Sequence, residues 1–343
     1  MTAKPIRMGW IGCGNHASEM LLPPLLSHGV VLTQLCDVDE GRLAEAARRF
    51  GVAPASCTKD HRALLGRDDL DAVGMAVGPE QHRDFAIEAL GRGLPVFMEK
   101  PPGGTLADAL KIEAASAKAD RLVAIGFMKR FSTANRIAIN VTRKPEFGPP
   151  ASFLGEYMTA PTYFERDPDY LGFYLHHCVH YLDLVPHLMG KPSAIETRRH
   201  ELAPGKLLLH VHFTFAGGAL GTLVMGTHQA RSTPMEWWQV MGDHTRVEVR
   251  NVHEVRYYRT PQFKADRADA SLVDSEDTLL WEPNLTVAMN EDHKGYHAII
   301  GAFLARLRGE AVELPTIADG VRAMAVLEAM LRSLETGERV ALA

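Results

Sequence analysis

The sequence predicts an α/β protein with two domains: a parallel sheet with helices on both faces, followed by an α/β domain with a large, open, mostly antiparallel sheet. Three observations predict this class. The chain has 343 residues, enough for two domains of ordinary size. Short apolar runs alternate with helical stretches over residues 1–125. Beyond them, period-two alternation of apolar and polar residues becomes common. We therefore expect one domain over 1–125 and a second over 126–343.

Composition and charge limit the function classes. Hydrophobic residues make up 46% and charged residues 23% of the chain, and the net charge is -5. A mildly acidic chain lacks the basic footprint that nucleic acid and anionic membranes require. No apolar run reaches the roughly 20 residues of a membrane helix, and no secretory signal is visible. The four cysteines form no CxxC pair, so we expect neither a disulfide framework nor a zinc knuckle, and we expect a cytoplasmic location.

The first 125 residues read as strand and helix in turn. Strand-like runs cover 6–12, 30–37, 71–77, 95–100 and 122–127, and helical spacing covers 39–51, 80–93 and 105–119. Buried parallel strands show such continuous apolar runs. Alternation of this kind implies right-handed crossovers and a parallel sheet.

The second half reads as antiparallel sheet and late helices. The run 206–227 predicts two strands around a Gly-Gly turn, and 237–251 and 253–260 predict more strand. Two amphipathic helices are expected over 296–309 and 319–337, the second with Asp319 as its N-cap. The two faces of such a sheet suggest self-association, although a helix layer could cover one of them.

A glycine pattern follows the first strand. "GWIGCGNHA" supplies Gly12, Gly14 and Ala17 of a G-x-G-x-x-G/A pattern between a strand and a helix, where backbone can approach a pyrophosphate. The next strand ends at Asp37, near the position where an acid binds the ribose hydroxyls of a dinucleotide. The pattern predicts a Rossmann domain that prefers NAD. Arg42 nearby leaves NADP possible, and a strand–turn–helix without ligand is the alternative.

Another candidate lies at a later strand end. "PVFMEKPP" closes a strand with Glu99 and Lys100, and ligands of parallel sheets bind at the carboxyl ends of strands. "GPEQH" closes the preceding strand. The alternatives are an ordinary surface lysine and, for His82, a surface residue at a helix N-terminus. The residues expected to bind the cofactor are Gly12, Cys13, Gly14, Asn15, His16, Asp37, Arg42, Val77, Pro79, His82, Glu99, Lys100 and Arg130.

A histidine-rich helix is expected at "LHHCVHYLDLVPHLMG", residues 175–190. Its His176 and His180 stand at i and i+4, which share one face of an α-helix. The same spacing occurs in metal-binding helices, but the glutamate of HExxH is missing and zinc normally needs three protein ligands. We therefore expect no metal. For His177 and His187, buried structural histidines are an equal alternative.

Taken in order, these motifs resemble one family. "GCGNHA", Asp37, "PEQH", "EKP", "GFMKRF" and "HYLD" are similar to the motifs of the glucose–fructose oxidoreductase / inositol dehydrogenase / MocA family. The resemblance implies NAD(P)-linked oxidation or reduction at a carbinol carbon, usually of a sugar or cyclitol. It also implies that Lys100 touches nicotinamide and substrate, and that His180 accepts the proton. The family's Asp-x-x-x-His-x-x-Asp pattern is matched at His180 and Asp183, whereas its first aspartate is replaced by His176.

The expected chemistry follows from these residues. We expect Lys100, His180 and His176 to be catalytic, with Lys100 polarising the oxygen and His176 orienting or relaying a proton. The residues expected to bind a small sugar or polyol substrate are Lys100, Tyr157, Tyr163, His176, His177 and His180. An aromatic residue in such a position is as often packing. The alternatives are a glycosidase or lyase that retains NAD and a non-catalytic NAD-binding protein. A homodimer or homotetramer through the C-terminal sheet is expected.

Overall fold

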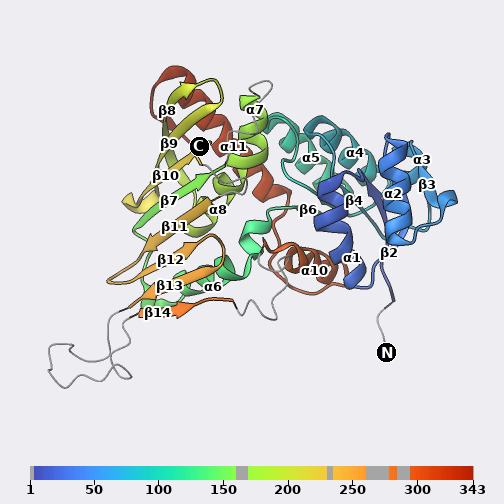
Figure 1. Cartoon of the computed structure of the whole chain (residues 1–343), viewed down its shortest axis with the longest axis horizontal. Helices are drawn as coiled ribbons and strands as arrows, with labels where there is room; N and C mark the ends of the chain where they lie inside the picture. The colour runs from blue at the N-terminus through green and yellow to red at the C-terminus, as the bar shows by residue number, and fades with distance from the viewer. Residues whose placement is uncertain (1–3, 160–168, 230–234, 260–277, 284–293, 343) are drawn as a thin grey trace. The chain divides into compact units, whose positions relative to one another are not determined.

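The chain divides into two compact units. The structure, a computed structural model, describes residues 4–159, 169–229, 235–259, 278–283 and 294–342 (Figure 1). The first unit comprises residues 1–128 and 295–325, and the second comprises 129–294 and 326–343. This division differs from the expected ranges because residues 295–325, assigned by sequence to the second domain, pack with the first unit.

The first unit is built on a parallel sheet of six strands. They run in the order β3-β2-β1-β4-β5-β6, and every pair in the sheet is parallel. This is the doubly wound order, in which the order of the strands reverses between β1 and β4, the place where such folds bind ligands. The strands are β1 (Arg7–Ile11), β2 (Val31–Cys36), β3 (Cys57–Thr58), β4 (Ala72–Met75), β5 (Val96–Met98) and β6 (Val123–Ile125). The predicted parallel sheet is confirmed.

Helices of the first unit begin and end at residues suited to those positions. Asp39 caps α2 by accepting a hydrogen bond from the Arg42 N–H, and Gly51 ends this helix in the left-handed conformation. Thr105 caps α5 in the same way. The helical segments are a π-turn (Ala17–Leu21), α1 (Leu22–Ser27), α2 (Glu40–Phe50), α3 (His61–Leu65), α4 (Pro79–Gly91), α5 (Leu106–Ala119) and α10 (Tyr296–Leu307).

Helix α10 joins the first unit through α1. The two helices contact one another and lie side by side (Figure 1). Residues Ile299, Ile300, Phe303 and Leu304 of α10 are buried, and the Phe303 ring lies 5.5 Å from that of Phe97 in β5. Apolar spacing predicts this helix, but such spacing does not reveal which sheet the apolar face will cover.

The second unit contains a mixed sheet of nine strands in the order β14-β13-β12-β11-β7-β10-β9-β8-β15. Only the central pair β7–β10 is parallel among the described strand pairs, so the sheet is mostly antiparallel, as predicted. The strands are β7 (Ser152–Met158), β8 (Pro192–Ala203), β9 (Lys206–Phe215), β10 (Leu220–Gly226), β11 (Met235–Met241), β12 (Arg246–Arg250), β13 (Glu254–Tyr258), β14 (Thr278–Trp281) and β15 (Val340–Ala341).

One face of this sheet is buried and the other is more open. Along β9, Leu207, Leu209, Val211, Phe213 and Phe215 are buried, as their alternation predicts. Helices α6 (Thr133–Thr142) and α8 (Val179–Met189) contact the sheet, at β12 and β13 and at β7 respectively (Figure 1). The opposite face carries Leu154 and Leu220, which are exposed, between polar neighbours.

The long helix α11 (Ile317–Thr336) starts two residues before the expected position. Thr316 precedes the helix, and Asp319 accepts a hydrogen bond from its N–H at 2.8 Å. Asp319 is therefore an acid of the first turn that reaches back to the chain before it, rather than the N-cap predicted. In the part of the chain that the structure describes, no helix combines the length and hydropathy needed to cross a membrane.

Candidate active site

The glycine turn is shaped by close backbone packing. Gly12 has a φ of 91°, and a Cβ on it would lie 2.2 Å from the carbonyl oxygen of Ala76, just beyond β4. No larger residue fits there without moving the backbone. A Cβ on Gly14 would instead meet nothing within 4 Å. The backbone at Gly14 therefore faces open space, and the next two residues, Asn15 and His16, are exposed.

Asp37 is fixed beside this turn. Its carboxylate accepts a hydrogen bond from the Cys13 N–H at 2.6 Å and another from the Asp39 N–H at 2.9 Å. A carboxylate has about four acceptor positions, so two backbone bonds leave capacity for ribose hydroxyls. The structure thus brings the glycine turn and Asp37 together, as the sequence spacing predicts.

A pocket of about 410 Å³ lies at this carboxyl edge of the parallel sheet. Gly12, Gly14, Asp37, Arg42 and Val77, which were expected at the cofactor, all line it. Val38, which follows Asp37, also lines the pocket. Sequence reasoning missed the other lining residues from the ends of β1 to β4 and from α3 and α4: Ile11, Cys36, Lys59, His61, Ala76, Gly78, Gln81 and Phe85. Their positions directly after strands are the signal that could have identified several of them.

Lys100 follows β5 beside a buried carboxylate. Glu99 is 5% exposed, and its Oε1 lies 3.6 Å from Nε2 of His16. Burial acts to raise the pKa of Glu99, but the charge of His16, its hydrogen bond to the carboxylate and the charge of Lys100 outweigh it and hold this pKa below its ordinary value. Glu99 therefore stays ionised at neutral pH and ties the glycine turn to the strand that carries Lys100.

His82 is buried and bonded to two backbone segments, so the alternative of a surface residue is wrong. It is 1% exposed; its Nε2 lies 3.1 Å from the Val77 N–H and its Nδ1 lies 3.0 Å from the Pro101 carbonyl oxygen. Because Nε2 accepts, Nδ1 carries the proton and donates. Pro79 is the first residue of α4, where a proline suits the helix start. His82 thereby joins the end of β4 to the turn that follows Lys100.

The histidine segment is not one regular helix. It runs as α7 (Tyr170–Phe173), a π-turn (Tyr174–Cys178) and then α8, so His176 and His180 stand in different helix types. The i, i+4 spacing of a regular α-helix therefore does not describe the backbone at His176, because a π-turn widens the helix by one residue. His180 is 7% exposed, and His176 is half-buried. Such π-turns are frequent at functional sites.

Arg130 is anchored to α8. Its Nε donates to Oδ2 of Asp183 at 2.8 Å, and its second guanidinium nitrogen bonds the other carboxylate oxygen. Both side chains are buried. Asp183 stands three residues after His180, so this two-point pair fixes the helix that carries His180. Through this contact within the second unit, Arg130 positions the helix α8.

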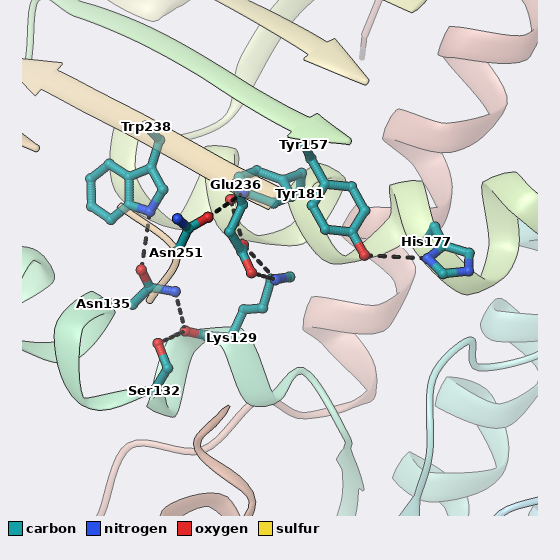
Figure 2. A network of polar contacts seen from close by, with 9 residues as sticks. All are labelled: Lys129, Ser132, Asn135, Tyr157, His177, Tyr181, Glu236, Trp238 and Asn251. Atoms are coloured by element: carbon teal, nitrogen blue, oxygen red, sulfur yellow. Dashed lines mark hydrogen bonds and ion pairs between the residues drawn. The ribbon is translucent and has the colours of Figure 1, made fainter. Parts of the chain in front are cut away.

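Lys129 lies at the centre of a buried network (Figure 2). Its Nζ lies 2.7 and 2.5 Å from the two carboxylate oxygens of Glu236, and the Tyr181 hydroxyl donates to the same carboxylate at 2.7 Å (Figure 2). The ammonium also lies 5.0 Å from the ring centre of Tyr157 and 5.3 Å from that of Tyr181. Lys129 is therefore a buried cation paired with Glu236.

The network continues to the π-turn. The Tyr157 hydroxyl lies 3.2 Å from Nδ1 of His177 (Figure 2). Tyr157 is 3% exposed, whereas His177 is half-buried. The pair therefore orients the His177 ring from the β7 side. Tyr163, also expected at the substrate, lies outside the described residues.

The cysteines offer no reactive thiolate. Burial raises the pKa of Cys13 and of Cys36 to about 12, with a further contribution from the charge of Asp37. Burial also raises the pKa of Cys178. These thiols stay protonated near neutral pH and act as apolar packing. Over the residues that the structure describes, no cluster of three or more His, Cys, Asp or Glu side chains could hold a metal ion.

The pocket fits the adenosine half of a dinucleotide. The Gly14 turn leaves room for a pyrophosphate against bare backbone, and Asp37 retains acceptor positions for ribose hydroxyls. Gly12, Gly14 and Asp37 would hold NAD at these points, while Val38 and Val77 supply apolar wall.

Comparison with known proteins agrees with this arrangement. Residues 6–127 match the family model described as an oxidoreductase family with an NAD-binding Rossmann fold, and residues 157–342 match its C-terminal alpha/beta domain. The inositol 2-dehydrogenase of Acidothermus cellulolyticus is 35% identical over 39% of this chain and 39% of its own length. The inositol 2-dehydrogenase 2 of Paenarthrobacter aurescens is 27% identical over 97% of each chain. The first relatives are thus matched over less than half of their length.

Solved structures share the fold over nearly the whole chain. A dehydrogenase from Chromobacterium violaceum superposes with a TM-score of 0.84 at 22% identity, covering 97% of this chain and 96% of its own. Levoglucosan dehydrogenase in complex with NADH and levoglucosan superposes with a TM-score of 0.82 at 17% identity, covering 99% and 100%. The two matched domain models, the strand order and the glycine turn lead to one conclusion: the chain belongs to the glucose–fructose oxidoreductase / inositol dehydrogenase / MocA family and carries its NAD-binding Rossmann domain.

Proposed function

We propose that the protein is an NAD-dependent oxidoreductase acting on a CH–OH group of a sugar, cyclitol or related polyol. The observation that carries the proposal is the anchored Lys100 turn, held by Glu99, His16 and His82 in the same unit as the glycine turn and its pocket. The names of the relatives, inositol 2-dehydrogenases, support this substrate class.

The proposed reaction oxidises a carbinol to a carbonyl. Bound NAD would supply the acceptor for the hydride of the C–H bond, and the hydroxyl proton is left to a group of the protein. His180 accepts that proton, and the Lys100 ammonium donates a hydrogen bond to the oxygen as negative charge develops on it. In the reverse direction the same groups return the proton and polarise the carbonyl.

The remaining residues would hold the substrate and the two main groups in place. His176 orients the substrate or relays a proton, and His177 and Tyr157 bind further hydroxyls. Arg130 acts through Asp183 on the helix of His180. Tyr163 stays a substrate-binding proposal. We further propose a cytoplasmic homodimer or homotetramer associated through the more open sheet face of the second unit.

A polyol screen tests this function. Incubation of the protein with NAD and a panel of sugars and cyclitols should release NADH for at least one compound, with NADP run in parallel. The Lys100→Met variant should bind NADH and fail to turn over. Binding of NAD without turnover of any compound would instead favour a non-catalytic NAD-binding protein.

Replacing His176 with aspartate is expected to preserve activity and shift its pH profile. A carboxylate at this position favours the protonated form of a neighbouring imidazole. Because His180 must be unprotonated to accept a proton, the acid limb of kcat/KM for oxidation should move to higher pH by about one unit.

The matched control is His176→Asn, which introduces no charge and should leave the acid limb in place. The measurement is kcat/KM against pH for the wild type and both variants. Complete loss of activity in His176→Asp would show that His176 has a role that a carboxylate cannot fill.

A further inference from the structure

Two cations and several carboxylates surround the outer part of the NAD pocket. Arg42 and Lys59 line the pocket together with Asp37. The Arg42 Nε lies 3.7 Å from Asp39, and the Lys59 Nζ lies 2.9 Å from Oε1 of Glu40. Each cation therefore faces a carboxylate already.

The pairing of β2 with β3 places Lys59 and Asp37 at equivalent positions, just beyond the ends of two neighbouring strands. Cys36 of β2 pairs with Thr58 of β3, and the Asp37 N–H donates to the Thr58 carbonyl oxygen at 3.3 Å. Lys59 is the next residue after Thr58, so it follows β3 at the level where Asp37 follows β2. Asp37 is the residue positioned for the ribose of NAD, and NADP differs from NAD only by a phosphate on that ribose.

We infer that the Glu40–Lys59 ion pair is a determinant of cofactor specificity: Glu40 holds the Lys59 ammonium, which would otherwise bind the 2′-phosphate of NADP. The inference deepens the cofactor part of the proposed function and rests on the assignment of this pocket to the adenosine half of the dinucleotide. Glu40 is then a second residue, besides Asp37, that disfavours NADP, and Lys59 is the group that would bind the phosphate once Glu40 is replaced.

The charges support this assignment. Asp37, Asp39 and Glu40 carry three negative charges against two positive charges on Arg42 and Lys59, which leaves a net charge of -1 around the pocket. A 2′-phosphate adds up to two further negative charges there, whereas a ribose hydroxyl adds none. Removing the charge of Glu40 both lowers this repulsion and releases the ammonium, whose three donors suit a phosphate as a point charge.

The ion pair is exposed, which makes the exchange of partners possible. The Lys59 side chain is 56% exposed and that of Glu40 is 79% exposed. Exposed pairs contribute little to stability and rearrange at little cost. Removing Glu40 should therefore change cofactor choice while leaving the fold intact.

The test is a binding titration that needs no substrate. NADH and NADPH are titrated separately, followed by cofactor fluorescence, into the wild type, Glu40→Gln, Lys59→Met and the double variant. The ratio Kd(NADPH)/Kd(NADH) should fall about fivefold in Glu40→Gln, the scale at which single exposed charge pairs act. In the double variant the ratio should return to near the wild-type value, because the released ammonium is gone.

A matched control removes a similar charge elsewhere in the same unit. Asp69 forms a half-buried ion pair with Arg67 at 2.6 Å and does not line the pocket. Asp69→Asn should leave the ratio unchanged. An unchanged ratio in Glu40→Gln, or a gain that survives in the double variant, overturns the inference. The titration measures binding alone, so failure of this inference can be distinguished from failure of the proposed oxidation. The latter would appear as absent turnover with normal NADH binding.

Discussion

Replacing His180 with alanine is expected to lower kcat/KM about 10³-fold, within the range that a general base contributes. The physical reason is that the hydroxyl proton would have no acceptor, while Lys100 alone still polarises the oxygen. Binding of NADH should remain at the wild-type level, because the glycine turn, Asp37 and the pocket all belong to the other unit. Steady-state kinetics with the substrate found by the polyol screen, paired with an NADH titration, measures both quantities.

The matched control is His187→Gln on the same helix. His187 stands in the last turn of α8, where its Nε2 lies 3.2 Å from the guanidinium of Arg143. Its replacement should leave kcat/KM within a few-fold of wild type. Turnover of His180→Ala close to that of His187→Gln would remove His180 from the mechanism.

Replacing Lys129 with methionine is expected to destabilise the second unit by about 3–5 kcal/mol, the cost of breaking a buried ion pair by removing one partner. The Lys129 and Glu236 side chains are 6% and 10% exposed. Without the ammonium, Glu236 keeps only the Tyr181 hydroxyl among the contacts described above, and a buried charge loses its counter-ion. Urea unfolding followed by tryptophan fluorescence measures the loss, since Trp238 is buried in the same unit.

Two variants make this prediction specific. Lys144→Met breaks an exposed pair with Glu146, whose atoms lie 3.9 Å apart, and should cost less than about 1 kcal/mol. Removing both charges with Lys129→Met and Glu236→Leu should recover much of the lost stability, because no unpaired charge remains. Equal losses in Lys129→Met and Lys144→Met would mean that the Lys129 pair adds little to the fold.

Local pattern was sufficient for β1, β2, β4, β5 and β6 of the parallel sheet and for β9 to β13 of the second sheet, whereas it did not predict β3, β7, β8, β14 or β15. The apolar runs that end at Gly12, Asp37 and Lys100 contain strands of the parallel sheet, and these three residues lie just beyond the strand ends. The alternation along 206–227 corresponds to β9 and β10. Both kinds of strand can be recognised from residues close in sequence. A strand buried on both faces shows a continuous apolar run, and a strand with one open face shows alternating apolar and polar residues. The glycine spacing likewise located a turn whose Gly12 tolerates no Cβ.

Long-range pairing was beyond the reach of local pattern. Glu236 stands 107 residues after Lys129, and nothing in "GFMKRF" indicates a carboxylate partner for a buried lysine. The position of α10 in the first unit has the same origin, because an amphipathic face does not name its partner. The surface alternative for His82 is wrong for a related reason: both of the bonds described for it are to backbone groups, which have no sequence signature.

The π-turn at Tyr174–Cys178 shows a different limit. Spacing arguments assume 3.6 residues per turn, and one added residue changes which side chains share a face. The i, i+4 argument for His176 and His180 makes that assumption, and a local pattern does not reveal the π-turn that carries His176.

The central claim is tested most directly by following one deuterium atom. A polyol that is turned over is supplied with deuterium on its carbinol carbon, together with NAD, and the products are examined by mass spectrometry. The account predicts one equivalent of deuterated NADH for each equivalent of carbonyl product. Product that forms without net NADH, with NAD regenerated on the protein in each turnover, would contradict it and identify a glycosidase or lyase that oxidises its substrate only transiently.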